Sequence, residues 1–259
     1  METIRILALG DIVGKGAVDK FCRSIRNFIS AEKIDATVVN GENAYPGNGI
    51  DPQSAHALLD AGADVITTGN HVFRRYEIAD MLNDGDRLIR PANYPPEAPG
   101  FGYTTVPVGA RKMLVINVMG VVYMDPLENP FRCVGRILER EKGTYDFSVL
   151  DIHAEATSEK IALGRYFDGK INIIYGTHTH VQTADEQVLP HGSGYITDLG
   201  MCGPDDSVLG VRTDRIIAKM TTMMPQKFDL ADGKVTMHGA VFELDADSGK
   251  VTTVKRVSF

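Results

Sequence analysis

The first part of the chain alternates short apolar runs with segments whose apolar residues recur at helical spacing. In the first helical segment, Val18, Phe21, Ile25 and Ile29 share one face. Asp51 followed by a proline is typical of the start of a second helix. The pattern predicts strands at 4–9, 36–39 and 65–67, and helices at 18–29, from 52 onward and at 76–82. Repeated strand–helix–strand units favour parallel strands joined by right-handed crossovers.

The rest of the chain is richer in strands. Residues 91–103 hold many glycines and prolines and predict a loop. Strands are predicted at 103–108, 113–118, 147–150, 171–175, 194–197, 235–244 and 251–257, with a helix at 155–167 and a hairpin turn at 245–249. No linker, repeat or low-complexity tract interrupts this pattern. We therefore expect a single domain over residues 1–259, of the α/β class, with two packed mixed β-sheets (a β-sandwich) flanked by helices.

Polar residues of the types that bind metals follow several of the predicted strands. They are Asp11, Glu42, Asn43, Asn70, His71, His153, His178 and His180. The last two lie in a Gly-x-His-x-His motif, and residues two apart in an extended segment point to the same side. Because the carboxyl ends of parallel strands meet at one edge of a sheet, we expect all these side chains to converge there.

The residue types favour a pair of transition metals. The set mixes carboxylate, amide and imidazole groups without cysteine, which suits manganese, iron, zinc or cobalt better than a thiolate zinc site or a calcium or magnesium site. The set is larger than one ion needs. Two ions about 3.5–4 Å apart, bridged by a carboxylate and a water, would use it.

Each of these residues also has a purely structural interpretation. Asp11 can cap a helix, Asn43 and Asn70 can serve turns, and His153 can be a surface histidine. Their shared position at strand ends favours a joint site. The remaining histidines lack that setting and are expected to be structural; they are His56, His191 and His238.

Composition narrows the class of partner and the compartment. The formal net charge of −7 argues against broad nucleic-acid binding, which needs a basic face, although bound cations would reverse the local sign for a small anionic substrate. The three cysteines are scattered, so we expect reduced thiols and a cytoplasmic protein. Each is interpreted as a small buried apolar residue, least so Cys202, which lies among glycines. No signal peptide or membrane span is predicted.

The order of these motifs resembles the calcineurin-like metallophosphoesterase superfamily, whose pattern is Asp-x-His, Gly-Asp-x-x-Asp, Gly-Asn-His-Glu, a later His and Gly-His-x-His. This chain departs from it at specific positions. Val13 replaces the first histidine, Glu42 the bridging aspartate and Val72 the glutamate, and the last motif reads Gly176-Thr177-His178. These departures resemble the YmdB-type subfamily over essentially the whole chain. The further segments that carry this resemblance are 8–14, 40–43, 90–95, 198–201 and 203–204.

The resemblance implies a bacterial cytoplasmic phosphodiesterase that acts on 2′,3′-cyclic nucleotides, with a metallophosphoesterase-like fold and a link to post-transcriptional regulation. Iron or manganese is implied in the site, with zinc compatible. The implied ligands are Asp11, Glu42, Asn43 and His180 for one ion and Glu42, Asn70, His153 and His178 for the other. Glu42 would bridge, and Asn43 would fill the place of the histidine missing at Val13. The implied partner is a small phosphodiester, with no membrane and no extended nucleic-acid interface; a homo-oligomer is left open.

The expected mechanism uses a metal-bridged hydroxide as the nucleophile and His71 as the general acid that protonates the leaving ribose oxygen. His71 has an alternative role, which is to hold its loop by hydrogen bonding. Two other functions remain open. One is a different metal-dependent phosphohydrolase, such as a phosphomonoesterase or nuclease, with substrate choice set by the loops at 46–49 and 93–94. The other is a non-catalytic regulator that binds metal or nucleotide.

Overall fold

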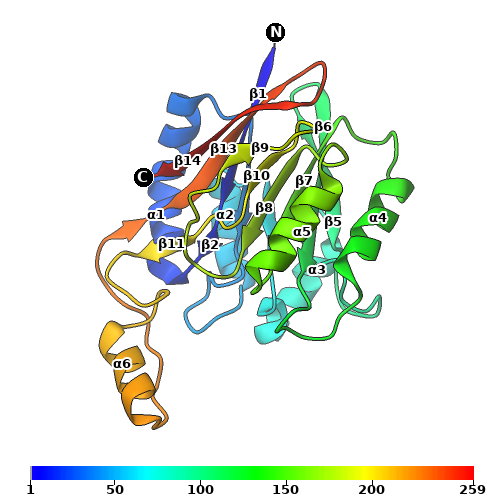
Figure 1. Cartoon of the computed structure of the whole chain (residues 1–259). Helices are drawn as coiled ribbons and strands as arrows, with labels where there is room; N and C mark the ends of the chain where they lie inside the picture. Colours follow the sequence, from blue (N-terminus) through cyan, green and yellow to red (C-terminus); the bar gives the residue numbers. More distant parts are fainter. Residues whose placement is uncertain (1) are drawn as a thin grey trace.

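The computed structural model describes residues 2–259, and two mixed β-sheets lie face to face at its centre (Figure 1). The first sheet has the order β14-β13-β1-β3-β4 and the second β5-β6-β7-β8-β10-β9. The first is built from β1 (Thr3–Leu9), β3 (Ala36–Asn40), β4 (Val65–Thr67), β13 (His238–Asp245) and β14 (Val251–Ser258). The second is built from β5 (Tyr103–Val108), β6 (Arg111–Met119), β7 (Phe147–His153), β8 (Ile173–Thr177), β9 (Gln187–Val188) and β10 (Gly194–Ile196).

Helices cover the outer face of each sheet (Figure 1). They are α1 (Gly14–Glu32) and α2 (Pro52–Ala61) on the first sheet and α4 (Pro130–Arg140) and α5 (Thr157–Phe167) on the second. The short 3-10 helices η1 (Val72–Arg74) and η2 (Tyr76–Ile78) and the helix α3 (Ala79–Asp84) follow β4 in the chain, whereas α6 (Thr213–Thr222) projects away from both sheets and buries none of its residues (Figure 1). One apolar cluster joins α1 and α2 to the first sheet, one lies between the sheets, and one joins α4 and α5 to the second sheet. The predicted α/β sandwich with flanking helices is confirmed.

The strand directions explain why one edge collects the polar residues. β1, β3 and β4 run parallel in the first sheet, and β6, β7, β8 and β10 run parallel in the second. The remaining strands of these sheets, β5, β9, β13 and β14, pair antiparallel with their neighbours. Both sheets therefore present the carboxyl ends of parallel strands, where ligand sites form in α/β proteins.

Several predicted elements differ from the observed ones. The segment 76–82 is divided between η2 and α3, and the predicted strand 235–244 is broken into β12 (Val235–Thr236) and β13. β12 joins β11 (Met201–Pro204) and β2 (Asp11–Ile12) in a small third sheet that was not predicted. Helices α4 and α6 were missed, although Asn129 caps α4 and a proline follows it.

The expectation that each cysteine is a small buried residue is wrong for Cys22. Its neighbours Phe21 and Ile25 carry the buried face of α1, which leaves Cys22 on an exposed side. Cys202, the residue least expected to be buried, is fully buried in β11, because it belongs to the apolar cluster that joins α1 and α2 to the first sheet. No helix in residues 2–259 combines the length and apolarity that crossing a bilayer requires.

Candidate metal centre

The ends of strands from both sheets place the predicted ligands within reach of one another. Asp11 follows β1, Glu42 follows β3, and Asn70 follows β4, while His153 ends β7 and His178 follows β8. Asp11, Glu42 and His153 are almost completely buried, whereas His71, His178 and His180 are partly exposed at the rim. The site therefore lies between the two sheets and not on one sheet alone.

Three of the side chains meet around the ring of His153. Its Nε2 atom lies 3.2 Å from Oε2 of Glu42, 3.1 Å from Oδ1 of Asn70 and 3.1 Å from Nδ1 of His178. One ligand atom each from Glu42, His153 and His178 fall within 4.8 Å of one another. Such spacing suits a single ion bound by nitrogen and oxygen atoms.

A second group lies next to it around Asp11. Oδ1 of Asp11 is 3.7 Å from Nε2 of His180 and, although buried, accepts no hydrogen bond from any group in residues 2–259. A buried carboxylate oxygen without a partner is costly, and a bound cation would satisfy it. The Glu42 carboxylate reaches both groups, with Oε2 near His153 and Oε1 3.2 Å from Nδ2 of Asn43.

Charge in the site is concentrated on these two carboxylates. Burial alone would raise the pKa of each, but the neighbouring histidines lower the pKa of Asp11 and bring that of Glu42 well below its ordinary value. Burial would lower the pKa of His153, yet Glu42 and Asp11 raise it to about 9. No Lys or Arg in residues 2–259 pairs with either carboxylate. The residues therefore suit divalent cations, which would take the place of the histidine protons.

Beneath the site, a buried network sets the tautomer of His153. Oγ1 of Thr177 donates to Oδ1 of Asp151 at 2.7 Å, so it accepts from Nδ1 of His153 at 2.9 Å. Once a cation replaces the proton on Nε2, the lone pair of that nitrogen would face the same space as Glu42 and Asn70. Burial raises the pKa of Asp151 to about 6, although the hydrogen bonds that its carboxylate accepts act to lower it. Asp151 was not among the predicted site residues. It lies two residues before His153 in the same strand, so both side chains point to the same face, and this spacing was the signal that could have identified it.

The other histidines are oriented in the same manner. His180 donates from Nδ1 to the carbonyl oxygen of Leu209 at 3.1 Å, which leaves Nε2 facing Asp11. The Nε2 atom of His178 lies 3.1 Å from Oε2 of Glu155, which leaves Nδ1 facing His153. Glu155 was not among the predicted site residues. Outer partners of this kind typically fix the orientation of metal-binding histidines.

The loop that carries His178 and His180 is not extended, contrary to the sequence expectation. β8 ends at Thr177, and His178 and His180 have φ angles of 96° and 63°. Residues other than glycine rarely adopt the left-handed region, at a cost of about 1–3 kcal/mol each. The contacts of Asp198 offset this cost, because its Oδ2 atom accepts hydrogen bonds from N and Oγ1 of Thr179 at 3.2 and 2.7 Å.

A buried ion pair supports the same loop. Nζ of Lys160 lies 2.7 Å from Oδ2 of Asp198, and both side chains are 1% exposed. We expect Lys160→Met to lower the free energy of unfolding by about 3–5 kcal/mol, because the substitution leaves a buried carboxylate without its cation. Urea denaturation would measure the change. The control is Lys15→Met, whose partner Asp19 is exposed, and a loss below about 1 kcal/mol is expected there. Equal losses in the two variants would contradict a structural role for the buried pair.

His71 lies at the rim with its ring against two predicted ligands. Its Nδ1 atom is 3.0 Å from Oε1 of Glu42 and 3.0 Å from Oδ1 of Asn43, and 21% of its side chain is exposed. The Nε2 atom makes no hydrogen bond within residues 2–259. Metal binding by Asn43 requires its amide to rotate, since Nδ2 and not Oδ1 now faces Glu42 and His180. The rotation would turn an N–H donor toward Nδ1 of His71.

Gly69 gives the cluster its space. A Cβ atom at this position would overlap Oε2 of Glu42 and the ring of His153. We expect Gly69→Ala to reduce bound metal and activity at least tenfold, because one or both side chains must move away. The control is Gly135→Ala on α4, where a Cβ atom meets nothing within 4 Å. Metal content and melting temperature would separate a local displacement from general unfolding, and unchanged metal content would contradict the close packing at Gly69.

The structure thus brings Asp11, Glu42, Asn43, Asn70, His71, His153, His178 and His180 together. Their roles as ligands and as the acid stay predictions. The histidines that were expected to be structural lie elsewhere: His56 and His191 are exposed, His191 pairs with Asp168, and the half-buried His238 follows β12.

Comparisons with known proteins place the chain in a family. The model of the YmdB-like protein family matches residues 7–257. The chain belongs to this family. A 2′,3′-cyclic-nucleotide 2′-phosphodiesterase of Bacillus subtilis is 41% identical over 254 residues, which cover 98% of this chain and 96% of that protein.

Two solved structures share the whole architecture. A phosphatase from Mycoplasma pneumoniae is 31% identical, with a TM-score of 0.93 over 100% of this chain and 94% of its own. A hypothetical protein from Thermus thermophilus is 37% identical, with a TM-score of 0.91 over 99% of each chain. The predicted family and the metallophosphoesterase-like fold are confirmed.

Proposed function

We propose that this chain is a metal-dependent hydrolase that cleaves 2′,3′-cyclic nucleotides at a dinuclear centre. The observation that carries the proposal is the pair of adjacent ligand groups that share Glu42, one of them with an unpartnered carboxylate oxygen on Asp11. The Bacillus subtilis relative, named as a 2′,3′-cyclic-nucleotide 2′-phosphodiesterase, supports the substrate class. Iron or manganese, with zinc compatible, matches the mixed nitrogen and oxygen donors.

Each predicted residue has a distinct task in this proposal. Asp11, Asn43 and His180 would hold one ion, and Asn70, His153 and His178 the other, with Glu42 shared between them. Bound ions of this kind lower the pKa of a water molecule and neutralise charge on phosphate oxygens. The chain itself supplies orientation, through Thr177 and Asp151 on His153 and through Glu155 on His178.

His71 is the residue placed to move a proton. Its Nδ1 atom is held against Glu42 and Asn43, which leaves Nε2 at the open rim. An alkoxide is a poor leaving group, so a proton donated from Nε2 to the departing ribose oxygen would lower the barrier. A cytoplasmic location, a single domain and an assembly of identical copies stay predictions.

One assay tests the proposal against the two open alternatives. Metal-loaded protein should hold close to two ions per chain and should open 2′,3′-cyclic AMP to a single mononucleotide. Elemental analysis and chromatography of the products are the measurements. Turnover of phosphomonoesters or of internal RNA bonds, without turnover of the cyclic nucleotide, would favour another phosphohydrolase. Metal binding without any turnover would favour a non-catalytic regulator.

A further inference from the structure

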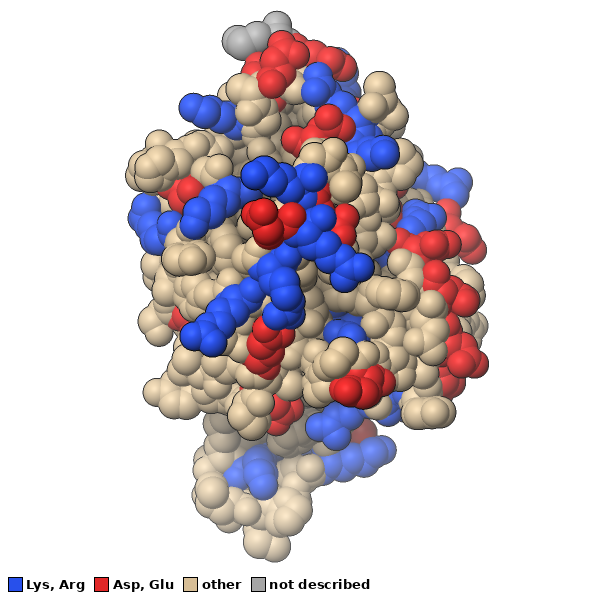
Figure 2. All heavy atoms as spheres, turned by 90° about the vertical axis from the view of Figure 1, so that its right-hand side faces the viewer, with Lys and Arg blue, Asp and Glu red and all other residues tan. Residues whose placement is uncertain are grey.

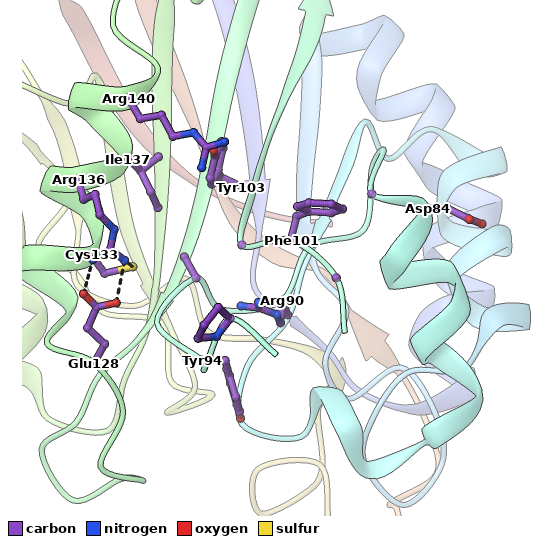
Figure 3. Close-up of a pocket in the computed structure, with 15 residues that line it drawn as sticks. Asp84, Arg90, Tyr94, Phe101, Tyr103, Glu128, Cys133, Arg136, Ile137 and Arg140 are labelled. Atoms are coloured by element: carbon purple, nitrogen blue, oxygen red, sulfur yellow. Dashed lines mark hydrogen bonds and ion pairs between the residues drawn. The ribbon is translucent and has the colours of Figure 1, made fainter. Parts of the chain in front are cut away.

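A cavity of about 860 Å³ lies beside the second sheet, between α4 and the loop that precedes β5 (Figure 3). None of the predicted metal ligands lines it. Its volume falls in the range of about 300–1,000 Å³ that is common for small-molecule sites. The proposed reaction does not use this cavity, although its walls carry arginine and aromatic side chains.

One wall is held in place by Arg90. This residue is 5% exposed, and its guanidinium donates hydrogen bonds to the carbonyl oxygens of Pro91, Ala98 and Pro99 at 2.8, 3.4 and 3.1 Å. These bonds fold the loop before β5 back on itself and give a preformed wall. No carboxylate in residues 2–259 forms an ion pair with Arg90, so its positive charge behind the wall is not neutralised.

The opposite wall adds cations from α4. Arg136 and Arg140 are four residues apart and therefore lie on the same face of the helix. Arg136 is engaged by Glu128 at 2.5 and 2.8 Å. The side chain of Arg140 is 75% exposed, and the nearest carboxylate oxygen, on Glu141, lies 3.7 Å from its Nε. Figure 2 shows several Lys and Arg side chains near the centre of this face, with Asp and Glu side chains between them.

Aromatic rings complete the lining. Phe101 is 56% exposed, so its ring is open to a ligand, and Figure 3 shows it on the side of the cavity opposite α4. The hydroxyl of Tyr103 donates to Glu141 at 3.0 Å, which fixes that ring below Arg140. Flat aromatic faces beside the exposed guanidinium of Arg140, which has only the long 3.7 Å contact with Glu141 among carboxylates in residues 2–259, match a planar base that carries a phosphate. Bases stack on aromatic rings, and arginine binds phosphate through paired N–H groups.

The geometry points to a nucleotide-binding site in this cavity, with the base stacked on Phe101 and the phosphate held by Arg140, with Arg90 behind the wall. Tyr94 connects the lining of the cavity to the segment that follows His71. The ring of Tyr94, which lines the cavity, packs edge-on against Phe73 at 5.4 Å, two residues beyond His71. The nucleotide has two sources: a free mononucleotide, or the nucleotide that precedes a terminal cyclic phosphate bound at the metal centre.

Binding measurements on the metal-loaded protein test the site itself. Calorimetric titration with 5′-AMP should show an affinity that Phe101→Ala and Arg140→Gln each weaken about tenfold, since each removes one of the two recognition groups. The matched controls are Phe228→Ala and Arg132→Gln, which are exposed and do not line the cavity, and these should leave the affinity within twofold of the parent. Adenosine and inorganic phosphate should each bind more weakly than 5′-AMP.

Turnover separates the two sources and rests on the proposed function. If the cavity holds the preceding nucleotide, both variants should lower kcat/KM for the dinucleotide ApA with a 2′,3′-cyclic end about tenfold and leave that for 2′,3′-cyclic AMP unchanged. If the cavity holds a free nucleotide, the two variants should weaken 5′-AMP binding and leave kcat/KM for both cyclic substrates unchanged. Equal 5′-AMP affinity in the parent and in both variants would overturn the site, as would phosphate binding as tightly as 5′-AMP. If the parent protein itself turns over no cyclic nucleotide, that result would instead contradict the proposed function.

Discussion

Glu42→Gln should abolish cyclic-nucleotide turnover and empty the metal centre at the same time. Glu42 is 1% exposed, and its two oxygens face the two ligand groups, one toward His153 and the other toward Asn43 and His71. Burial opposes ionisation, yet the neighbouring histidines hold the pKa of Glu42 well below its ordinary value, so the carboxylate is charged at neutral pH. Glutamine has nearly the same shape but cannot supply that charge between two cations.

We expect activity to fall by more than about 100-fold. Mutation of a residue that only orients a metal ligand typically lowers metal affinity or activity by about 10–100-fold, and loss of a ligand itself should cost at least as much. Elemental analysis should show less than one ion per chain, and circular dichroism should show an intact fold. Glu155→Gln is the graded control, since this half-exposed carboxylate contacts only the outer nitrogen of His178. Near-normal metal content and turnover in folded Glu42→Gln would show that Glu42 is not the shared ligand.

His71→Ala should keep both metals and still lower kcat for cyclic nucleotides by about 10²–10⁴-fold. The ring lies at the rim, where Nδ1 contacts Glu42 and Asn43 and Nε2 makes no hydrogen bond within residues 2–259. Its loss would therefore remove these contacts but none of the predicted ligand atoms. Elemental analysis and steady-state kinetics on the folded variant are the measurements.

The leaving group distinguishes an acid from a loop-holding residue. A nitrophenyl phosphodiester releases a stable phenolate without protonation, so its turnover by His71→Ala should drop far less than that of 2′,3′-cyclic AMP. His56→Ala, on the exposed side of α2, is the control and should change neither rate. Equal losses on the two substrates would indicate that His71 holds the loop and is not the acid.

Local patterns in the sequence were sufficient to predict most strands of the two main sheets and to show that polar residues follow several of them. Apolar runs bounded by glycines marked β1, β3 and β4, and the helical spacing at 18–29 lies within α1. These signals depend on residues a few positions apart, as does the placement of Asp11 and Glu42 just beyond strands. The missed helix α4 carried a local signal as well, Asn129 followed by a proline, within residues 119–146, to which no element had been assigned.

The sequence by itself determined which side chains stand at strand ends, because strand periodicity and turn residues act over a few positions. Only the tertiary structure decided how they meet: two sheets contribute to one site, and His178 and His180 reach it through left-handed backbone conformations. Asp198 and Lys160 stabilise that loop, and Asp151 fixes the ring of His153 through Thr177. These contacts join segments far apart in the chain, so their energies depend on packing that no local pattern encodes.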